Sequence, residues 1–127
     1  MNLNQVTLPT KNMEQAIAFY QLLGLKLIVD SRPRYARFEC PEGDSTFSLH
    51  QVDQWQTDPG TSIYFECGNL DEKVEELQKE GVIFDAPITD QSWLWREARL
   101  RDPDGNHLIL YLAGTNRKNP PWRIGGS

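Results

Sequence analysis

The sequence predicts an α+β protein made of two tandem βαβββ modules, and an internal repeat is the main reason. Residues 12–24 (NMEQAIAFYQLLG) match residues 69–81 (NLDEKVEELQKEG), and residues 36–44 (ARFECPEGD) match residues 98–106 (ARLRDPDGN). Stretches that alternate apolar and polar residues flank each helical copy, as β-strands do. A short repeated unit cannot bury a core alone, so we expect the two copies to face each other and to enclose any binding site.

The composition is that of an ordinary globular domain. The 127 residues are 39% hydrophobic and 24% charged, with a net charge of −5, so neither nucleic acid nor an anionic membrane is an expected partner. No apolar run reaches membrane-spanning length, and the first ten residues lack the pattern of a signal peptide. Cys40 and Cys67 show no CxxC spacing and are interpreted as free thiols, which favours a cytoplasmic location.

The first module, residues 1–53, begins with a predicted strand at residues 3–8. A helix follows, because Asn12 and Gln15 have the spacing of a capping box and Gly24 favours the left-handed conformation that ends a helix. Apolar residues recur at helical spacing between these two ends. Three further strands are predicted, with proline and glycine turns between them, at residues 25–30, 34–40 and 45–52.

The second module, residues 60–113, repeats this order. Its helix is expected to begin with a second capping box, formed by Asn69 and Glu72, and to end at Gly81. Its predicted strands cover residues 62–67, 82–84, 94–101 and 107–113. The last two strands are joined by the turn Pro-Asp-Gly-Asn, which is typical of a hairpin.

The two modules together are one predicted domain, residues 1–113. The segment 114–127 that follows is polar and rich in proline and glycine, and we interpret it as a C-terminal tail. Trp122 is its only large aromatic residue, which makes it the candidate to anchor the tail to the surface.

Strand periodicity predicts which side chains point away from the helices. Alternate residues lie on opposite faces, and the apolar set of each strand, including Leu94 and Leu112, is assigned to the helices. The other face is polar, as the solvent side of an antiparallel sheet normally is, but its aromatic residues favour a sheltered binding surface. The predicted substrate-binding residues on it are Gln5, Arg37, Ser48, Ser62, Tyr64, Trp95, Arg99 and Tyr111.

His50 is the candidate catalytic residue. It lies on the same face at the end of a strand, where it would act as a general base or a metal ligand, with Glu66 or Glu39 as the nearest carboxylate. The alternative is a histidine that is hydrogen-bonded at the rim of the sheet.

Two arginines related by the repeat, Arg37 and Arg99, are the candidates to bind an anion. Paired guanidinium groups suit a carboxylate or phosphate substrate, which they contact through two hydrogen bonds each. The alternative is that each arginine pairs with a neighbouring acid, Glu39 or Glu97, and stabilises its own sheet.

Four segments of the chain resemble the vicinal oxygen chelate superfamily. They are QVTL (5–8), NMEQAIAFYQLLGL (12–25), SIYFECGNLDEKVEELQKEGV (62–82) and RDPDGNHLILY (101–111). The superfamily includes glyoxalase I, bleomycin-resistance proteins, fosfomycin-resistance transferases and extradiol dioxygenases. The resemblance implies that the modules form a cup-shaped, eight-stranded mixed sheet and that two chains pair as a homodimer.

The resemblance also implies a divalent metal inside the cup, held by His, Glu or Gln side chains. It places the ligand positions at Gln5 and Ser62 in the first strand of each module, and at Ile109 and either Ser48 or Phe47 in the last. Isoleucine cannot coordinate a metal, and serine is a poor ligand for the ions concerned. The remaining donors are too few to offset the desolvation of the ion, so we expect no cofactor, with a divalent metal as the disfavoured alternative.

These features support three interpretations of function. The favoured one is a protein that binds a small anionic or aromatic molecule in the cup without a metal, similar to the bleomycin-resistance members. The first alternative is an enzyme, a lyase resembling lactoylglutathione lyase or a dioxygenase, with a non-standard metal ligand set that includes Gln5 and His50. The second alternative is a dimeric interaction module whose cup is filled by side chains.

Overall fold

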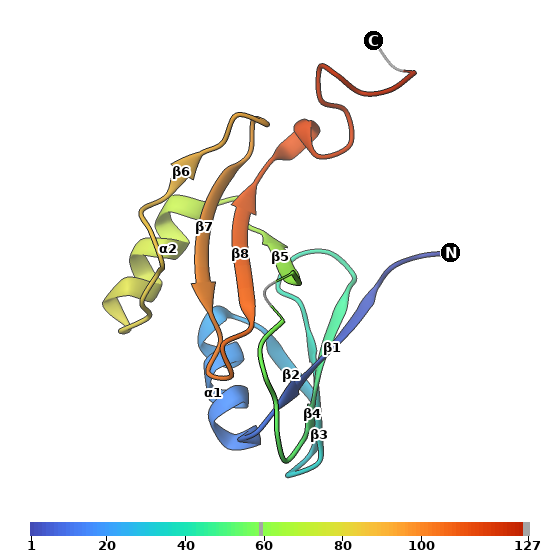
Figure 1. Cartoon of the computed structure of the whole chain (residues 1–127), viewed down its shortest axis with the longest axis vertical. Helices are drawn as coiled ribbons and strands as arrows, with labels where there is room; N and C mark the ends of the chain where they lie inside the picture. The colour runs from blue at the N-terminus through green and yellow to red at the C-terminus, as the bar shows by residue number, and fades with distance from the viewer. Residues whose placement is uncertain (59, 126–127) are drawn as a thin grey trace. The chain divides into compact units, whose positions relative to one another are not determined.

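The computed structural model describes residues 1–58 and 60–125, which divide into two compact units (Figure 1). The first unit is Met1–Pro59 with Asp102–Asn106, and the second is Gly60–Arg101 with His107–Ser127. Each unit holds one four-stranded mixed sheet and one α-helix, which confirms the predicted α+β class. The union of the two sheets in one cup stays a prediction, as does the homodimer. No helix among the described residues is long and apolar enough to cross a membrane.

The first unit is ordered β1-β4-β3-β2 across its sheet, with β1 parallel to β4 and the other neighbours antiparallel. Its elements are β1 (Gln5–Thr10), α1 (Met13–Leu23), β2 (Lys26–Ser31), β3 (Tyr35–Glu39) and β4 (Thr46–Gln51). The apolar stripe of α1 is buried together with Ala36, Phe38, Phe47 and Leu49 of the sheet. The ring of Tyr20 lies at the centre of this core, with its centroid 4.5 Å from that of Phe47.

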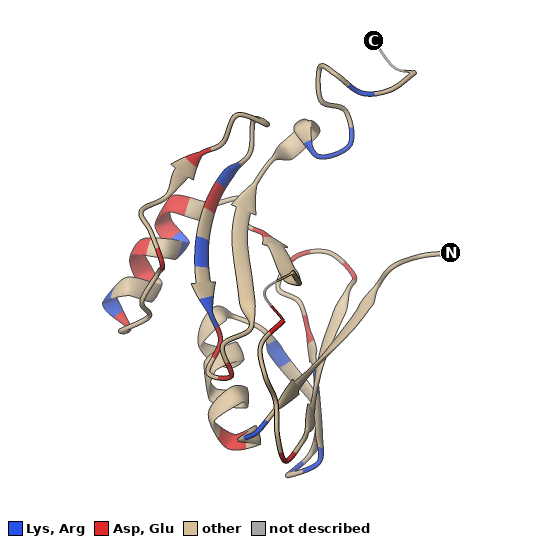
Figure 2. Cartoon of the chain, viewed as in Figure 1, with Lys and Arg blue, Asp and Glu red and all other residues tan. Residues whose placement is uncertain are grey.

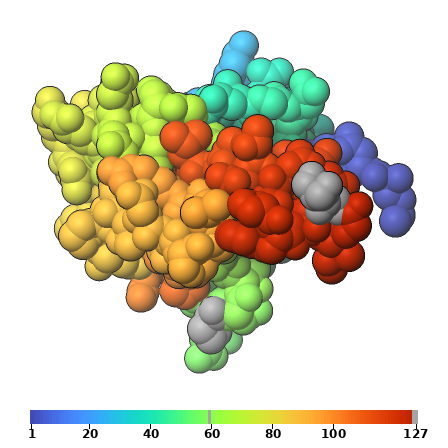
Figure 3. Space-filling view, turned by 90° about the horizontal axis from the view of Figure 1, so that it is seen from above, coloured from blue at the N-terminus to red at the C-terminus, as the bar shows by residue number. Residues whose placement is uncertain are grey.

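The second unit has the same design, with the strand order β5-β8-β7-β6 and β5 parallel to β8. Its elements are β5 (Ser62–Glu66), α2 (Leu70–Lys79), β6 (Thr89–Asp90), β7 (Arg96–Arg101), β8 (His107–Leu112) and the 3₁₀ helix η1 (Gly114–Asn116). The buried residues of α2 and of the sheet face that it covers are Leu70, Val74, Leu77, Ala98, Leu100, Leu108 and Leu110. Figure 3 shows the residues after β8 beside those that lead into β7.

The helix ends agree with the sequence except at one cap. The Asn12 side chain accepts a hydrogen bond from the Gln15 amide at 3.1 Å, and Gly24 ends α1 with φ of 106°. Gly81, with φ of 92°, likewise follows α2. Asn69 is the N-cap residue of α2, as predicted, but the predicted capping box is wrong, because its backbone (φ −113°, ψ 48°) is not extended and its side chain makes no cap hydrogen bond. Acidic residues in the first turn, visible in Figure 2, instead complement the positive end of the α2 dipole.

The edge of the second sheet differs from the prediction. Residues 82–84 form no strand, and only Phe84 pairs with β7, as an isolated bridge to Leu100. Pro87 has no amide hydrogen to continue this ladder, so the edge strand β6 begins after it. The assignment of Leu94 to the core is also wrong, because Leu94 lies in the turn before β7 with φ of 68° and is 48% exposed. Leu112, the last residue of β8, is exposed as well.

The turn Asp102–Asn106 belongs to the first unit, although the sequence assigns it to the second module. The buried Asp102 carboxylate accepts four hydrogen bonds: from the Tyr20 hydroxyl at 2.6 Å, and at 2.9 Å each from the amides of Asp104 and Asn106 and the Asn106 side chain. The indole of Trp55 donates to the Asn106 side-chain oxygen at 2.9 Å. A buried carboxylate needs several donors to offset its lost hydration, and this turn supplies three of the four.

We predict that Tyr20→Phe lowers the free energy of unfolding by about 1–3 kcal/mol, because it removes one donor from the buried Asp102 carboxylate. The measurement is urea denaturation at pH 8. The pH dependence supplies a second check. Burial, followed by the Asp102 charge, raises the pKa of Tyr20 well above its ordinary value of 10.0.

The unfolded chain therefore releases the Tyr20 proton near pH 10 while the folded chain retains it, so this contribution to stability is complete below pH 10 and is lost above it. The wild type should lose more stability than the Phe variant between pH 9 and pH 11. Equal losses would contradict the assignment.

Candidate functional site

The predicted site residues lie on the open face of each sheet, the face away from the helix. In the first unit, strand register arranges this face in three rows across β1, β4 and β3. The rows are Pro9–His50–Tyr35, Thr7–Ser48–Arg37 and Gln5–Thr46–Glu39. The period of two in each strand puts all nine side chains on one side of the sheet, and this result follows from the alternation that the sequence shows.

A chain of hydrogen bonds connects the middle of this face. The Gln5 amide nitrogen donates to the Ser48 hydroxyl oxygen at 2.6 Å, and the Gln5 oxygen accepts from Thr46. Ser48, which is fully buried, also shares a 2.7 Å hydrogen bond with the Tyr35 hydroxyl. The structure therefore brings two predicted site residues, Gln5 and Ser48, into direct contact. Each has a further hydrogen-bond partner that the sequence did not single out, Thr46 for Gln5 and Tyr35 for Ser48.

Arg37 extends the chain of hydrogen bonds at its exposed end. Its Nε donates to the Tyr35 hydroxyl at 2.8 Å, and its guanidinium carbon lies 5.4 Å from the centroid of the Tyr35 ring. Glu39, the acid expected to pair with it, forms no ion pair with it within the described residues. Burial acts to raise the pKa of Tyr35, but its hydrogen bonds with Ser48 and Arg37 and the guanidinium charge outweigh burial and lower the pKa from 10.0.

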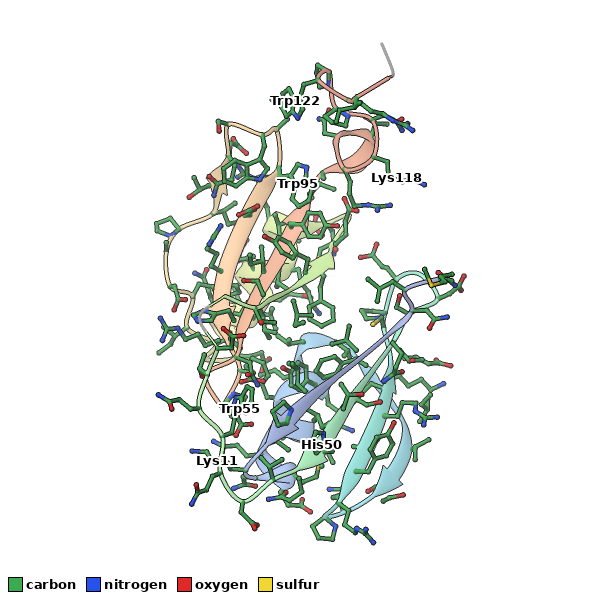
Figure 4. All side chains as sticks on the ribbon, turned by 45° about the vertical axis from the view of Figure 1, so that its right-hand side comes forward. Lys11, His50, Trp55, Trp95, Lys118 and Trp122 are labelled. Atoms are coloured by element: carbon green, nitrogen blue, oxygen red, sulfur yellow. The ribbon has the colours of Figure 1, made fainter. Side chains whose placement is uncertain are left out.

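His50 lies one row from Ser48 and two rows from Gln5, the other residues of this face that were considered as metal ligands. It is exposed on β4, directly opposite Tyr35, and its side chain has no hydrogen bond or ion pair within the part of the chain that is described (Figure 4). It is four positions along β4 from Thr46, the partner of Gln5, which is about 13 Å at the usual rise per residue. Glu39 lies in the same distant row, so no carboxylate of this sheet face is adjacent to His50.

The open face of the second unit carries a group of three aromatic residues, Tyr64, Trp95 and Tyr111. Trp95 stacks on Tyr111 with ring centroids 4.8 Å apart, and Tyr64 meets both rings edge to face, at 5.8 Å and 5.5 Å. Tyr111 and the neighbouring Ile109 are buried in this cluster, while Tyr64 is 46% exposed. Three of the aromatic residues that the sequence assigns to this face therefore contact one another, and the ring of Tyr64 is left partly exposed.

Arg99 has a carboxylate partner, unlike Arg37. Glu97, which is 2% exposed, accepts a hydrogen bond from Arg99 at 2.9 Å, and its other oxygen accepts from the Trp93 indole at 3.1 Å. Gln91 lies within 3.4 Å of the same carboxylate. Arg99 thus compensates a buried charge, which was the alternative that the sequence left open, whereas the role of Trp93 was missed because it depends on the fold of the turn before β7.

The residues after β8 are held at the edge of this aromatic group. Glu66 accepts hydrogen bonds from the backbone amides of Ala113 and Gly114 at 2.8 Å and 2.9 Å, and the Trp95 indole donates to the Asn116 carbonyl at 3.2 Å. Trp122 is 57% exposed. The tail is therefore anchored by Trp95 and Glu66 rather than by Trp122 (Figure 4).

The donor set at the inherited metal positions does not fit a divalent cation. In the first unit, the Gln5 oxygen already accepts from Thr46, and Ser48 is buried beneath Gln5 and Tyr35. In the second unit, Ser62 is exposed and Ile109 has no donor atom. The described residues contain no group of three or more His, Cys, Asp or Glu side chains that could hold a metal ion.

Residues 2–110 match the family model described as Glyoxalase/Bleomycin resistance protein/Dioxygenase superfamily. No curated protein matches the chain. Similar solved structures include lactoylglutathione lyase from Agrobacterium tumefaciens, with 16% identity, a TM-score of 0.72 and coverage of 87% of this chain and 92% of that one. A bleomycin-binding protein complexed with bleomycin has 21% identity, a TM-score of 0.69 and coverage of 88% and 98%. These structures share the fold.

We predict that the two repeat-related arginines respond differently to substitution. Arg99→Met should lower the free energy of unfolding by about 1–3 kcal/mol, because it removes a charged donor from the buried Glu97 carboxylate. Arg37→Met should change it by less than about 0.5 kcal/mol, because Arg37 is exposed and has no carboxylate partner among the residues that the structure describes. Urea denaturation of both variants measures this, and equal effects would show that the Glu97 pairing is not what Arg99 provides.

Proposed function

Because the chain belongs to the Glyoxalase/Bleomycin resistance protein/Dioxygenase superfamily, we propose that it binds a small aromatic molecule without a metal ion. The observation that carries this proposal is the group Tyr64, Trp95 and Tyr111 on the open face of the second unit. Small-molecule sites in proteins are lined mainly by aromatic and apolar side chains with a few polar groups. The solved bleomycin-binding relative, complexed with bleomycin, supports a binding role for this fold.

The aromatic group is well suited to a flat ligand because its rings are already ordered. Tyr111 and Trp95 stack on each other, and Tyr64 is fixed by edge contacts with both rings while about half of its surface remains exposed. A ring that is held in place loses little conformational freedom when a ligand packs on it. Each well-placed aromatic pair adds about 0.5–1.5 kcal/mol beyond the burial of surface.

The chemistry of Ile109 supports a mode of binding that needs no metal. This position, where the family resemblance places a metal ligand, is packed in the same cluster as Tyr111 and Trp95. The cluster offers apolar surface where a metal site would need charged or polar donors. The metal-dependent alternative would require Gln5 and His50 to share one ion, and the length of β4 between them weighs against that.

We predict that neutral aromatic compounds raise the melting temperature more than saturated analogues of the same size do. Benzamide and 2-naphthamide should stabilise the protein, whereas cyclohexanecarboxamide should have a smaller effect, because it lacks a π face to stack on Tyr64. Isothermal titration calorimetry gives the affinities. Neutral probes are chosen so that the arginine side chains contribute no charge interaction.

The matched variants are Tyr64→Ala and Trp122→Ala. Both remove an exposed aromatic side chain, but only Tyr64 belongs to the aromatic group. Tyr64→Ala should weaken 2-naphthamide binding about tenfold or more, and Trp122→Ala should leave it unchanged. Absence of binding by every aromatic probe would favour the interaction module instead.

We also predict that protein exposed to Ni²⁺, Zn²⁺ or Fe²⁺ and then desalted retains well below one ion per chain. The reason is that Ile109 supplies no donor and that Gln5 is engaged with Thr46. Elemental analysis of wild type and His50→Ala measures this. One tightly held metal per chain, lost in the His50 variant, would overturn the proposal in favour of the metal-dependent enzyme.

A further inference from the structure

Arg37 differs from the arginines of β7, because it has no carboxylate partner in the described part of the chain. Each of the three in β7 is paired with carboxylates: Arg96 with Asp71 and Asp90, Arg99 with Glu97, and Arg101 with Asp85. Figure 2 marks these basic positions along β7. Arg37 is fixed through Nε by Tyr35, and within the described residues no contact uses its two terminal nitrogens. It therefore presents an ordered, uncompensated guanidinium edge on the open face of the first unit.

A count of protons shows that the pair beside Arg37 has a hydrogen-bond donor left over. Tyr35 and Ser48 have one hydroxyl proton each, but a single 2.7 Å hydrogen bond joins their oxygens and uses only one of them. The Gln5 amide donates to the Ser48 oxygen, and Arg37 donates to the Tyr35 oxygen. Neither contact takes up a proton of the pair, so one O–H of the two remains to be satisfied by an acceptor.

The charges around this pair favour a negatively charged acceptor. His50 lies directly opposite Tyr35, and Lys26 lies opposite Glu39 at the far end of the face. Glu39 is an acidic residue on the same side of β3 as Arg37, and within the described residues the two form no ion pair. The guanidinium edge presents two parallel N–H groups, a geometry that matches the oxygens of a carboxylate or phosphate.

We propose that Arg37, Tyr35 and Ser48 form a binding site for an oxyanion, a carboxylate or phosphate group, on the open face of the first unit. The terminal nitrogens of Arg37 donate to the anion, and the spare hydroxyl proton of the Tyr35–Ser48 pair supplies a further donor. This site is independent of the aromatic group of the second unit. Its test accordingly uses probes that have no aromatic ring.

The first test is a titration with inorganic phosphate and, separately, with acetate, followed by calorimetry at low ionic strength. Arg37→Gln should weaken the binding of either anion about tenfold, because it removes the charge that defines the site. Arg34→Gln is the matched control, since Arg34 is an exposed arginine three residues away with no side-chain partner within the described residues. An equal loss of affinity in both variants would mean that the anion responds only to the overall charge of the protein, and this would overturn the proposed site.

The two probes separate the possible sources of the anion. Tighter binding of phosphate identifies a phosphoryl group as the natural ligand chemistry, and tighter binding of acetate identifies a carboxylate. Binding of neither anion by the wild type, while 2-naphthamide still binds, would refute this site and leave the proposed aromatic site intact. The reverse result would refute the aromatic site alone.

The second test uses the ionisation of Tyr35, followed by phenolate absorbance between pH 8 and pH 10.5. The phenolate can accept from both Ser48 and Arg37, which leaves no spare proton for an anion. Bound phosphate should therefore raise the pKa of Tyr35, and the affinity for phosphate should fall as Tyr35 ionises. The absorbance step that Tyr35→Phe removes identifies the residue. If phosphate does not change the pH at which this absorbance step occurs, the proposed role of the hydroxyl pair is overturned.

The same titration separates the site from its charged surroundings. His50, Glu39 and Lys26 are the ionisable groups that share the face with Tyr35 and Arg37. His50→Gln should keep the phosphate-dependent shift of the Tyr35 step, because within the described residues the His50 side chain forms no hydrogen bond with the hydroxyl pair. Loss of the shift in this variant would assign the anion to His50 rather than to Arg37.

Discussion

The buried carboxylate of Asp102 is the group on which the first unit depends. A charge removed from water must be fully hydrogen-bonded, and the turn Asp102–Asn106 supplies three of its four donors. The fourth donor is Tyr20, whose ring lies at the centre of the core between α1 and the sheet. The position of α1 and the burial of Phe47 in β4 are thus tied to one polar contact. Since Phe47 and Ser48 are neighbours on opposite faces of β4, the same contact fixes where the open face begins.

The two open faces have diverged while the backbone repeat has been kept. In the first unit the face is polar, and a chain of hydrogen bonds runs from Gln5 to Arg37. In the second unit the face is aromatic, and its arginine is used to compensate the buried Glu97. The division has a physical basis. Ser48 is small enough to lie beneath Tyr35, whereas Ile109 at the corresponding place in β8 requires apolar neighbours.

The sequence was informative where the determining forces are local. Asn12 and Gly24 set the two ends of α1 through interactions and backbone geometry within a few residues. Strand alternation placed Arg37, Ser48 and Tyr64 on the correct faces of their sheets. It was misleading at Asn69, where the backbone conformation prevents the capping hydrogen bond. It was also misleading at residues 82–84, where only Phe84 pairs with β7 and the edge strand begins after Pro87. The hydrogen bond between Tyr35 and Ser48 joins residues of the neighbouring strands β3 and β4 that are diagonal to each other. The hydrogen bond from Trp93 to Glu97 depends on a turn in which Leu94 has a positive φ. Neither has a signal in residue type or spacing.

The place of Asp102–Asn106 in the first unit has a consequence for how the chain is made. A ribosome releases the N-terminal residues first, and a domain generally folds as soon as its segments have emerged. Here Tyr20 and Trp55 have their hydrogen-bond partners more than fifty residues further along the chain. The early half of the protein must therefore wait, with the hydroxyl of its central tyrosine unpaired, until most of the later half has been synthesised. The last hairpin of the chain thus supplies the hydrogen-bond partners that complete the core of the first unit.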